Sequence, residues 1–130
     1  MTTPTPALTT ILVYDDIAAA HNFLVTTFGL AAGQLARNAG GEVMHGEIGI
    51  GTDTVWLHRV SPEHGLGSVA KLGAATGMLN VFVADVDAHY TRVKAAGARI
   101  DFPPTDMPYG QREYAAFDCE GRIWSFATRT

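Results

Sequence analysis

Hydrophobic and polar residues in this chain follow two periods, which predicts a fold of mixed helices and strands. Apolar runs or apolar–polar alternation of period two are typical of strands, and apolar residues spaced three and four apart are typical of helices. The segments with strand-like patterns are 8–14, 42–50, 54–60, 78–84, 112–118 and 122–128, with a further short strand near 98–102. The segments with helix-like patterns are 16–28 and 86–96.

The second half of this pattern repeats the first. "VYDDIAAAHNFLVTTFGL" (13–30) and "VADVDAHYTRVKAAGARI" (83–100) each leave a strand, pass an N-capping Asp, continue as a helix and stop at a glycine. "TVWLHRV" (54–60) also resembles "RIWSFAT" (122–128), which predicts that Trp56 and Trp124 are matching core residues 68 positions apart. The capping residues Asp16 and Asp85 are 69 positions apart, so an internal duplication explains both matches.

This duplication predicts an α+β domain over residues 1–130, built from two tandem βαβββ modules. Module one spans about 7–60, a Gly/Ser/Ala-rich linker spans 61–77, and module two spans about 78–128. The prolines in 102–111 argue against regular structure throughout that segment. We expect the modules to form a curved mixed sheet around a cup-shaped cavity, with the helices on the outer face.

Strand alternation predicts which side chains face this cavity. In 42–50 the apolar even-numbered row packs on the helix, which leaves His45 and Glu47 on the opposite face. In the last strand Trp124 and Phe126 are core candidates, which leaves Ser125 facing the cavity. An apolar inner row is then expected, consisting of Ile11, Val13, Leu57, Met78 and Phe82.

Composition narrows the classes of function. The 130 residues carry a net charge of −4 with nine scattered Lys and Arg, which argues against nucleic-acid binding. No apolar run is long enough for a membrane helix, and the opening "MTTPTPALTT" reads as a polar tail without the features of a signal peptide. The single cysteine, Cys119, excludes an internal disulfide and fits a reducing cytoplasm.

From Ala7 to Thr128 the chain resembles the vicinal oxygen chelate superfamily, which includes glyoxalase I, extradiol dioxygenases and bleomycin-resistance-type proteins. The segments that carry the resemblance are "ILVYDDIAAAHNFLVTTFGL", "MHGEIGIGTDTVWL", "VFVADVDAHYTRVKAAGA" and "YGQREYAAFDCEGRIWSFAT". The last is similar to the C-terminal signature of the family, except that Cys119 stands where the turn usually has proline.

The resemblance also implies where a metal site would lie. Metal enzymes of the family have four ligand positions, which correspond here to Thr9, Leu57, Met78 and Ser125. A shift of one residue, to Thr10, Trp56, Leu79 or Phe126, restores no ligand. None of these side chains is a carboxylate or an imidazole, so we expect neither a metal nor another cofactor.

Several polar side chains remain as candidates for a site. His45 and Glu47 form either a ligand-contacting acid/base pair or an ordinary solvated strand pair. A replacement metal site would need a third donor such as His58 or Glu113, and alternation places His58 on the side of Trp56, away from His45. His21 and His89 are expected to face solvent from the helices, and Cys119 has no environment that lowers its pKa.

The proline-rich loop is flanked by aromatic and basic side chains. Tyr109, Arg112 and Tyr114 are predicted to close over a flat or anionic ligand through stacking, unless Arg112 pairs with Asp118 or Glu113 instead. Arg59 is a further candidate for an anionic group. The predicted ligand-binding residues are Val13, His45, Glu47, Leu57, Arg59, Met78, Asn80, Phe82, Tyr109, Arg112, Tyr114 and Ser125.

These features favour a metal-free small-molecule-binding protein, similar to the bleomycin-resistance type, which sequesters an antibiotic or an aromatic metabolite. The alternative is a lyase, isomerase or dioxygenase of the same superfamily that uses His45 and Glu47, with or without a shifted metal site. A third interpretation is a vestigial cup in a protein that acts through an interface. Exposed strand edges and the resemblance both predict a homodimer.

Overall fold

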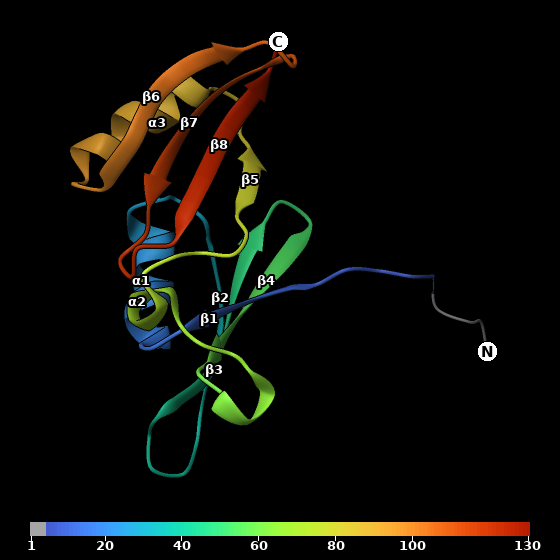
Figure 1. Ribbon diagram of the computed structural model, residues 1–130. Helices are drawn as coiled ribbons and strands as arrows, with labels where there is room; N and C mark the ends of the chain where they lie inside the picture. Colours follow the sequence, from blue (N-terminus) through green and yellow to red (C-terminus); the bar gives the residue numbers. More distant parts are fainter. Residues whose placement is uncertain (1–4) are drawn as a thin grey trace.

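The computed structural model describes residues 5–130 and confirms the α+β class and the two consecutive βαβββ modules (Figure 1). Residues 1–4 of the predicted polar tail lie outside the described residues. Module one contains β1 (Thr10–Tyr14), α1 (Ile17–Thr26), β2 (Ala31–Arg37), β3 (Val43–Ile50) and β4 (Asp53–Arg59). Module two contains β5 (Leu79–Phe82), α3 (Val86–Ala95), β6 (Arg99–Met107), β7 (Gln111–Phe117) and β8 (Ile123–Arg129). The intervening segment contains a 3₁₀ turn (Pro62–His64) and α2 (Val69–Leu72).

The strands form two separate four-stranded sheets with the same topology. Their strand orders are β1-β4-β3-β2 and β5-β8-β7-β6, and in each sheet the first strand runs parallel to its neighbour. The long helix of each module covers one face of its own sheet, as Figure 1 shows for α3 behind β6 and β7. We call the opposite faces of the two sheets the inner faces. They contain Ile11, Val13, His45, Glu47, Trp56 and His58 in module one, and Asn80, Phe82, Gln111, Glu113, Ser125 and Ala127 in module two.

Both long helices begin where the sequence predicts. Asp16 accepts a hydrogen bond from the backbone N–H of Ala19, and Asp85 accepts one from that of Ala88, each at 3.0 Å. These carboxylates pair with N–H groups that the first helical turn leaves without partners. After the helix ends, Gly29 and Gly97 adopt φ angles of 72° and 92°, which residues with a Cβ atom rarely adopt.

Two strands differ from the sequence prediction. β2 has no hydrophobic alternation, and all seven of its residues are exposed, so no pattern revealed it. β6 continues through Pro103 and Pro104 to Met107, although a non-regular loop was predicted there. It is an edge strand whose pairing with β7 shifts register twice, between Ile100 and Thr105, and an edge strand tolerates missing N–H donors.

The two modules share a core centred on aromatic residues from both. Phe28, at the end of α1, makes edge-on contacts with Trp124 and Phe126 of β8 at centroid distances of 5.7 and 5.0 Å. His89 of α3 is 6% exposed, and its Nε2 lies 2.8 Å from the carbonyl oxygen of Phe28. The prediction that His89 faces solvent is therefore wrong, because this histidine joins the modules.

A turn of module two also docks onto module one. The carboxylate of Asp118 is 6% exposed and accepts four hydrogen bonds, one of them from the hydroxyl of Tyr14 at 2.7 Å. The carboxylate of Glu120 accepts the backbone N–H groups of Asp15 and Asp16 at 2.8 and 2.9 Å. The Asp-x-x-Gly turn that resembled a family signature thus holds module two against the start of α1.

Within residues 5–130, none of the helices is long and apolar enough to cross a membrane.

Candidate functional site

The repeat register of the structure differs from the one that the tryptophans suggest. β1 pairs Ile11 with Trp56, and β5 pairs Asn80 with Ser125, so Trp56 is the counterpart of Ser125 at a spacing of 69 residues. Trp124 is fully buried, whereas Trp56 is 40% exposed on the inner face. The prediction that the two tryptophans are matching core residues is therefore wrong.

The same shift moves Leu57 out of the predicted site. Its side chain is fully buried in the core, and its neighbours in the sheet are Leu12 and Gly46 on the helix-facing side. The family's ligand position in this strand therefore falls on Trp56, one residue earlier. The prediction of Leu57 as a cavity-lining residue is wrong, because the strand carries its odd-numbered residues toward α1.

A small polar and aromatic group lies on the inner face of module one. His45 Nε2 and Glu47 Oε2 are 2.9 Å apart, with both side chains 31% exposed. The ring of Trp56 lies edge-on to that of His45 at 5.6 Å. His58 is the cross-strand neighbour of His45, so it shares the face of His45 and Trp56, but its Nδ1 lies 2.6 Å from the carbonyl oxygen of Arg59. His45 and Glu47 could form hydrogen bonds with a ligand that lies over Trp56, or exchange a proton with it.

Polar side chains on the inner face of module two form a continuous hydrogen-bonded row. Ser125 donates its hydroxyl to Asn80 Oδ1 at 2.7 Å, and Gln111 Nε2 lies 3.5 Å from the same oxygen. Gln111 also donates to Glu113 Oε1 at 3.0 Å, and the hydroxyl of Tyr109 donates to that oxygen as well. This contact with Glu113 raises the pKa of the Tyr109 hydroxyl, which therefore keeps its proton as the donor.

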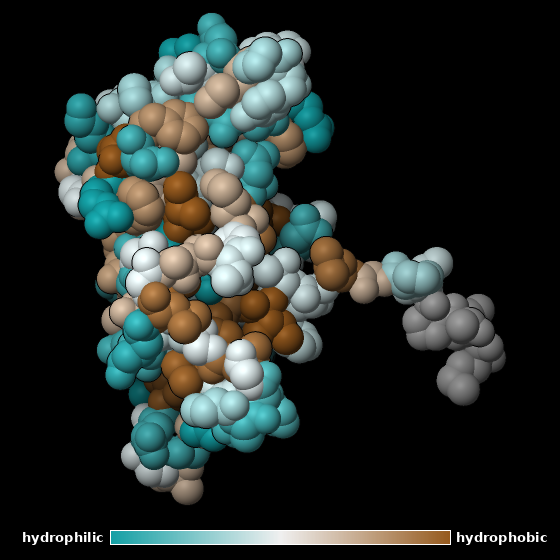
Figure 2. All heavy atoms as spheres, viewed as in Figure 1, coloured by the Kyte–Doolittle hydropathy of each residue, from teal (hydrophilic) through white to brown (hydrophobic). Residues whose placement is uncertain are grey.

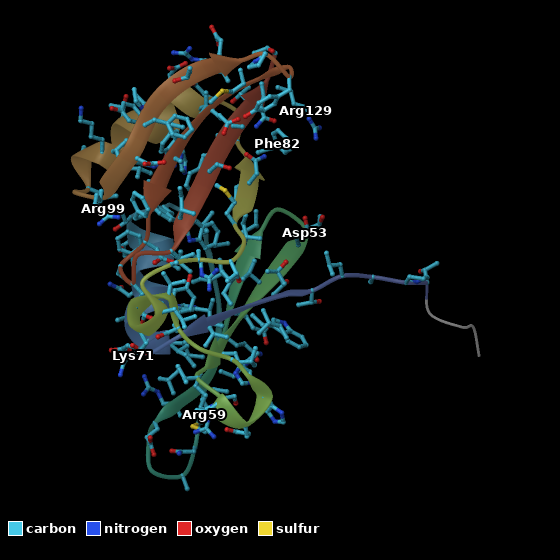
Figure 3. All side chains as sticks on the ribbon, viewed as in Figure 1. Asp53, Arg59, Lys71, Phe82, Arg99 and Arg129 are labelled. Atoms are coloured by element: carbon cyan, nitrogen blue, oxygen red, sulfur yellow. The ribbon has the colours of Figure 1, made fainter. Side chains whose placement is uncertain are left out.

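The hydrogen-bonded row of module two ends next to the ring of Phe82 and a cleft. The guanidinium of Arg129 stacks on the ring of Phe82, 4.0 Å from its centroid, and Figure 3 shows the two residues next to each other at the end of β5. A cleft of about 630 Å³ lies between β5, the β3–β4 turn (50–55), Leu8 and Thr10. Figure 2 shows hydrophobic side chains on this side of the molecule. The cleft is comparable in volume to small-molecule sites.

The structure places the other predicted residues as follows. Val13 lies on the inner face and is 7% exposed, and Met78, 50% exposed, directly precedes β5. Arg59 is exposed at the end of β4, with Nη1 3.7 Å from the sulfur of Met44. Arg59 is two residues after Leu57 in β4, so both lie on the face of the sheet opposite the inner face.

Two predicted residues near the proline-rich segment point away from the inner face. Arg112 forms ion pairs with Asp87 and Asp106 at 3.0 and 3.3 Å, and these hydrogen bonds raise its pKa. Tyr114 is fully buried, and burial raises its pKa as well. The predicted Tyr109–Arg112–Tyr114 group is therefore wrong, because alternate residues of β7 face opposite sides of its sheet.

The sequence prediction did not place Gln111, Glu113 and Arg129 on the inner face, where the structure has them. The alternation of Gln111, Glu113 and Ala115 was the available signal, since it marks the face opposite Tyr114. Glu113 was considered as a third metal donor and as a partner of Arg112, whose ion pairs are instead with Asp87 and Asp106.

The donor set does not fit the metal site of the family. With the corrected register, the four positions are Thr9, Trp56, Met78 and Ser125, and none supplies a carboxylate or an imidazole. Among residues 5–130, no three His, Cys, Asp or Glu side chains are grouped closely enough to hold a metal ion. His45 and Glu47 therefore have no third partner of that kind.

Comparisons with known proteins agree with this architecture. A family model described as the Glyoxalase/Bleomycin resistance protein/Dioxygenase superfamily matches residues 7–126. An uncharacterised protein of Mycobacterium bovis is 34% identical over 125 residues, which cover 92% of this chain and 81% of that protein. The crystal structure of TioX from Micromonospora sp. ML1 has a TM-score of 0.74 at 30% identity, over 96% of this chain and 97% of that chain. TnmS3, an antibiotic binding protein from Streptomyces sp. CB03234, has a TM-score of 0.76 at 20% identity, over 100% of both chains.

Proposed function

The chain belongs to the Glyoxalase/Bleomycin resistance protein/Dioxygenase superfamily, and from this premise we propose that it is a metal-independent small-molecule-binding protein. Its two modules act as one ligand-binding domain, and the ligand is a planar, partly apolar molecule such as an antibiotic or an aromatic metabolite. TnmS3, which shares the fold, is an antibiotic binding protein, and this is consistent with the proposal. The single exposed cysteine suits a reducing, cytoplasmic setting.

The exposed apolar side chains on the inner faces are the observation that carries this proposal. Trp56, Met78 and Phe82 are 40–50% exposed, and they lie on strands or directly before one. Two of them, Trp56 and Met78, occupy the positions where metal enzymes of the family have ligands. A site that replaces metal donors with a large aromatic ring and a thioether favours stacking on a ligand over Lewis-acid chemistry.

We propose further that a second copy of the chain completes the cavity. β1 and β5 are edge strands, each hydrogen-bonded to one neighbour within the described chain. Beside them, residues 5–9 run away from both sheets (Figure 1), with Leu8 92% exposed and Ile11 48% exposed. In a homodimer the second copy would pair with these strand edges and cover these apolar side chains. Sedimentation equilibrium should give twice the chain mass, and a monomer at micromolar concentration would contradict this part.

A thermal-shift screen of aromatic antibiotics and small metabolites, run on chelator-treated protein, tests the proposed function. A hit should raise the melting temperature without added metal, and the shift should fall in Trp56→Ala and Phe82→Ala. Leu72→Ala is the matched control, because Leu72 is 64% exposed on α2 and outside the inner faces. Stoichiometric, tightly bound metal in the purified protein, found by elemental analysis, would contradict metal independence.

The His45–Glu47 contact of 2.9 Å supports one alternative, an enzyme of the same superfamily. A histidine held by a carboxylate is a common acid/base arrangement. For such an enzyme, Glu47→Gln would abolish turnover of a bound compound and leave its affinity nearly unchanged. For a binding protein, no bound compound is converted by the wild type.

A further inference from the structure

Glu113 is a nearly buried carboxylate without a basic partner. It is 8% exposed on the inner face, and both donors to it, Tyr109 and Gln111, are neutral and bind the same oxygen, Oε1. Among residues 5–130, no Lys, Arg or His nitrogen lies within 4.0 Å of its carboxylate. Burying an ionised carboxylate without a countercharge is costly, so such groups are retained mainly where a partner arrives from outside.

The second oxygen of this carboxylate has no donor among the described residues. No described side chain donates to Glu113 Oε2, yet that atom is not among the buried polar atoms without a partner. Its neighbours across the sheet are Ala127 on β8 and Thr105 on β6. Oε2 is thus an acceptor with some remaining exposure, and it can take a hydrogen bond from a donor that arrives from outside.

Two aromatic side chains lie near Glu113 on this side of the sheet. Tyr109 folds back from the β6–β7 turn so that its hydroxyl reaches Glu113, and its side chain is 65% exposed. Phe82 lies opposite Ala127 on β5, one strand further across the sheet. A carboxylate beside the exposed ring of Tyr109 suits a ligand with a cationic group attached to a planar ring system, because aromatic rings attract cations and the carboxylate accepts their N–H groups. The ring of Phe82 already carries the guanidinium of Arg129, 4.0 Å from its centroid.

We propose that Glu113 is the specificity-determining residue of the ligand site, and that it selects ligands carrying a protonated amine next to an aromatic ring. This inference rests on the proposed function. The ammonium group donates to Oε2, and Gln111 and Tyr109 hold Oε1 in place. The ring lies over the inner face toward Phe82 and the cleft lined by Asn80.

Three naphthalene compounds that differ only in their polar group test this proposal. They are 1-naphthylmethylammonium, neutral 1-naphthylmethanol and anionic 1-naphthoate, each titrated into ¹⁵N-labelled full-length protein and followed by ¹H–¹⁵N spectra. The ammonium compound should bind at least about tenfold more tightly than the alcohol, as a charge-assisted hydrogen bond predicts. It should also shift the side-chain amide resonances of Gln111, which the alcohol should leave nearly unchanged.

Glu113→Gln should remove the ammonium preference and leave the affinity for the alcohol within about twofold. Glu63→Gln is the matched control, because it removes the same charge at an exposed site outside the inner faces, and the preference should persist in it. If Glu113→Gln does not fold, the Gln111 resonances of the wild type decide the question.

The outcomes separate the two proposals. Binding of the alcohol without a preference for the ammonium compound overturns the role of Glu113 and leaves the proposed function standing. The role is also overturned if Glu113→Gln retains the preference, or if it changes only the sedimentation mass, which would assign the carboxylate to a subunit contact. Binding of none of the three compounds counts against both proposals.

Discussion

The hydrogen bonds of Asp118 make a strong prediction about stability. Its Oδ1 accepts the backbone N–H groups of Glu120 and Arg122, both at 3.0 Å. Its Oδ2 accepts the hydroxyl of Tyr14 at 2.7 Å and the indole N–H of Trp124 at 3.1 Å. Because Tyr14 and Trp124 are at most 1% exposed, water cannot replace a lost acceptor for either donor.

Asp118→Asn preserves the shape of this side chain and replaces one oxygen with an NH₂ group. Whichever way the amide is oriented, two of the four donors then face another donor. A buried donor without an acceptor costs roughly 1–3 kcal/mol, so the variant should lose about 2–6 kcal/mol of its free energy of unfolding. No cavity is created, so the loss reports the hydrogen bonds and the charge of this carboxylate and not a change in packing.

Urea unfolding followed by tryptophan fluorescence and circular dichroism, at one fixed protein concentration, measures this loss. Asp101→Asn is the control, because Asp101 is exposed on β6, and a change within about 0.5 kcal/mol is expected. Tyr14→Phe removes one of the four donors, so the double variant should be less destabilised than the sum of the single variants, by about 1 kcal/mol. Additive effects, or an Asp118→Asn variant as stable as the Asp101→Asn control, would refute the role of Asp118 in joining the modules.

Three further predictions concern other parts of the chain. Burial lowers the pKa of His89 below its ordinary value of 6.5, so the unfolded chain binds a proton that the folded chain resists. Stability should therefore fall as the pH drops through about 6.5, more steeply in the wild type than in His89→Gln, and equal slopes would contradict the buried neutral histidine. Desolvation and the carboxylates of Asp118 and Glu120 raise the pKa of Cys119 to about 11, from an ordinary 9.0. Iodoacetamide should thus alkylate it at pH 7.5 about a hundredfold more slowly than a cysteine of ordinary pKa in a short unfolded peptide, whereas equal rates would argue against this environment. Gly33→Ala would place a Cβ 2.5 Å from the carbonyl oxygen of Glu47 and should cost about 1–3 kcal/mol in urea unfolding. Gly77→Ala, which meets no atom within 4 Å, should change the stability little, and similar costs for the two variants would contradict the close approach of β2 to β3.

Local signals made much of the fold predictable from the sequence. The N-caps Asp16 and Asp85, the glycines after the helices and the period-two pattern of β3 act within a few residues, so they can be read without the tertiary structure. β2 lacked such a signal, because a strand exposed along its whole length needs no hydrophobic alternation.

The site was predicted less completely, for physical reasons that differ from residue to residue. Because both strands contain a tryptophan, the sequence suggested that Trp56 and Trp124 occupy equivalent positions in the two modules. Which face of the sheet each tryptophan lies on depends on how its strand pairs with β1 or β5, and only the structure shows this pairing. His89 is hydrogen-bonded to the carbonyl oxygen of Phe28, which lies 61 residues away in the sequence. The pattern of its own helix therefore could not predict that it is buried. Glu113 resembles any polar strand residue in the sequence, and only the structure shows its burial and the placement of its two donors.

The most direct test of metal-independent binding is the affinity of the aromatic compound that gives the largest thermal shift, measured by isothermal titration calorimetry in EDTA. We predict the same Kd with EDTA as with added divalent cations. Binding should be about tenfold weaker or more in Phe82→Ala and Trp56→Ala, and unchanged in Leu72→Ala. Binding that is lost in EDTA and restored by one equivalent of a divalent cation would contradict the account.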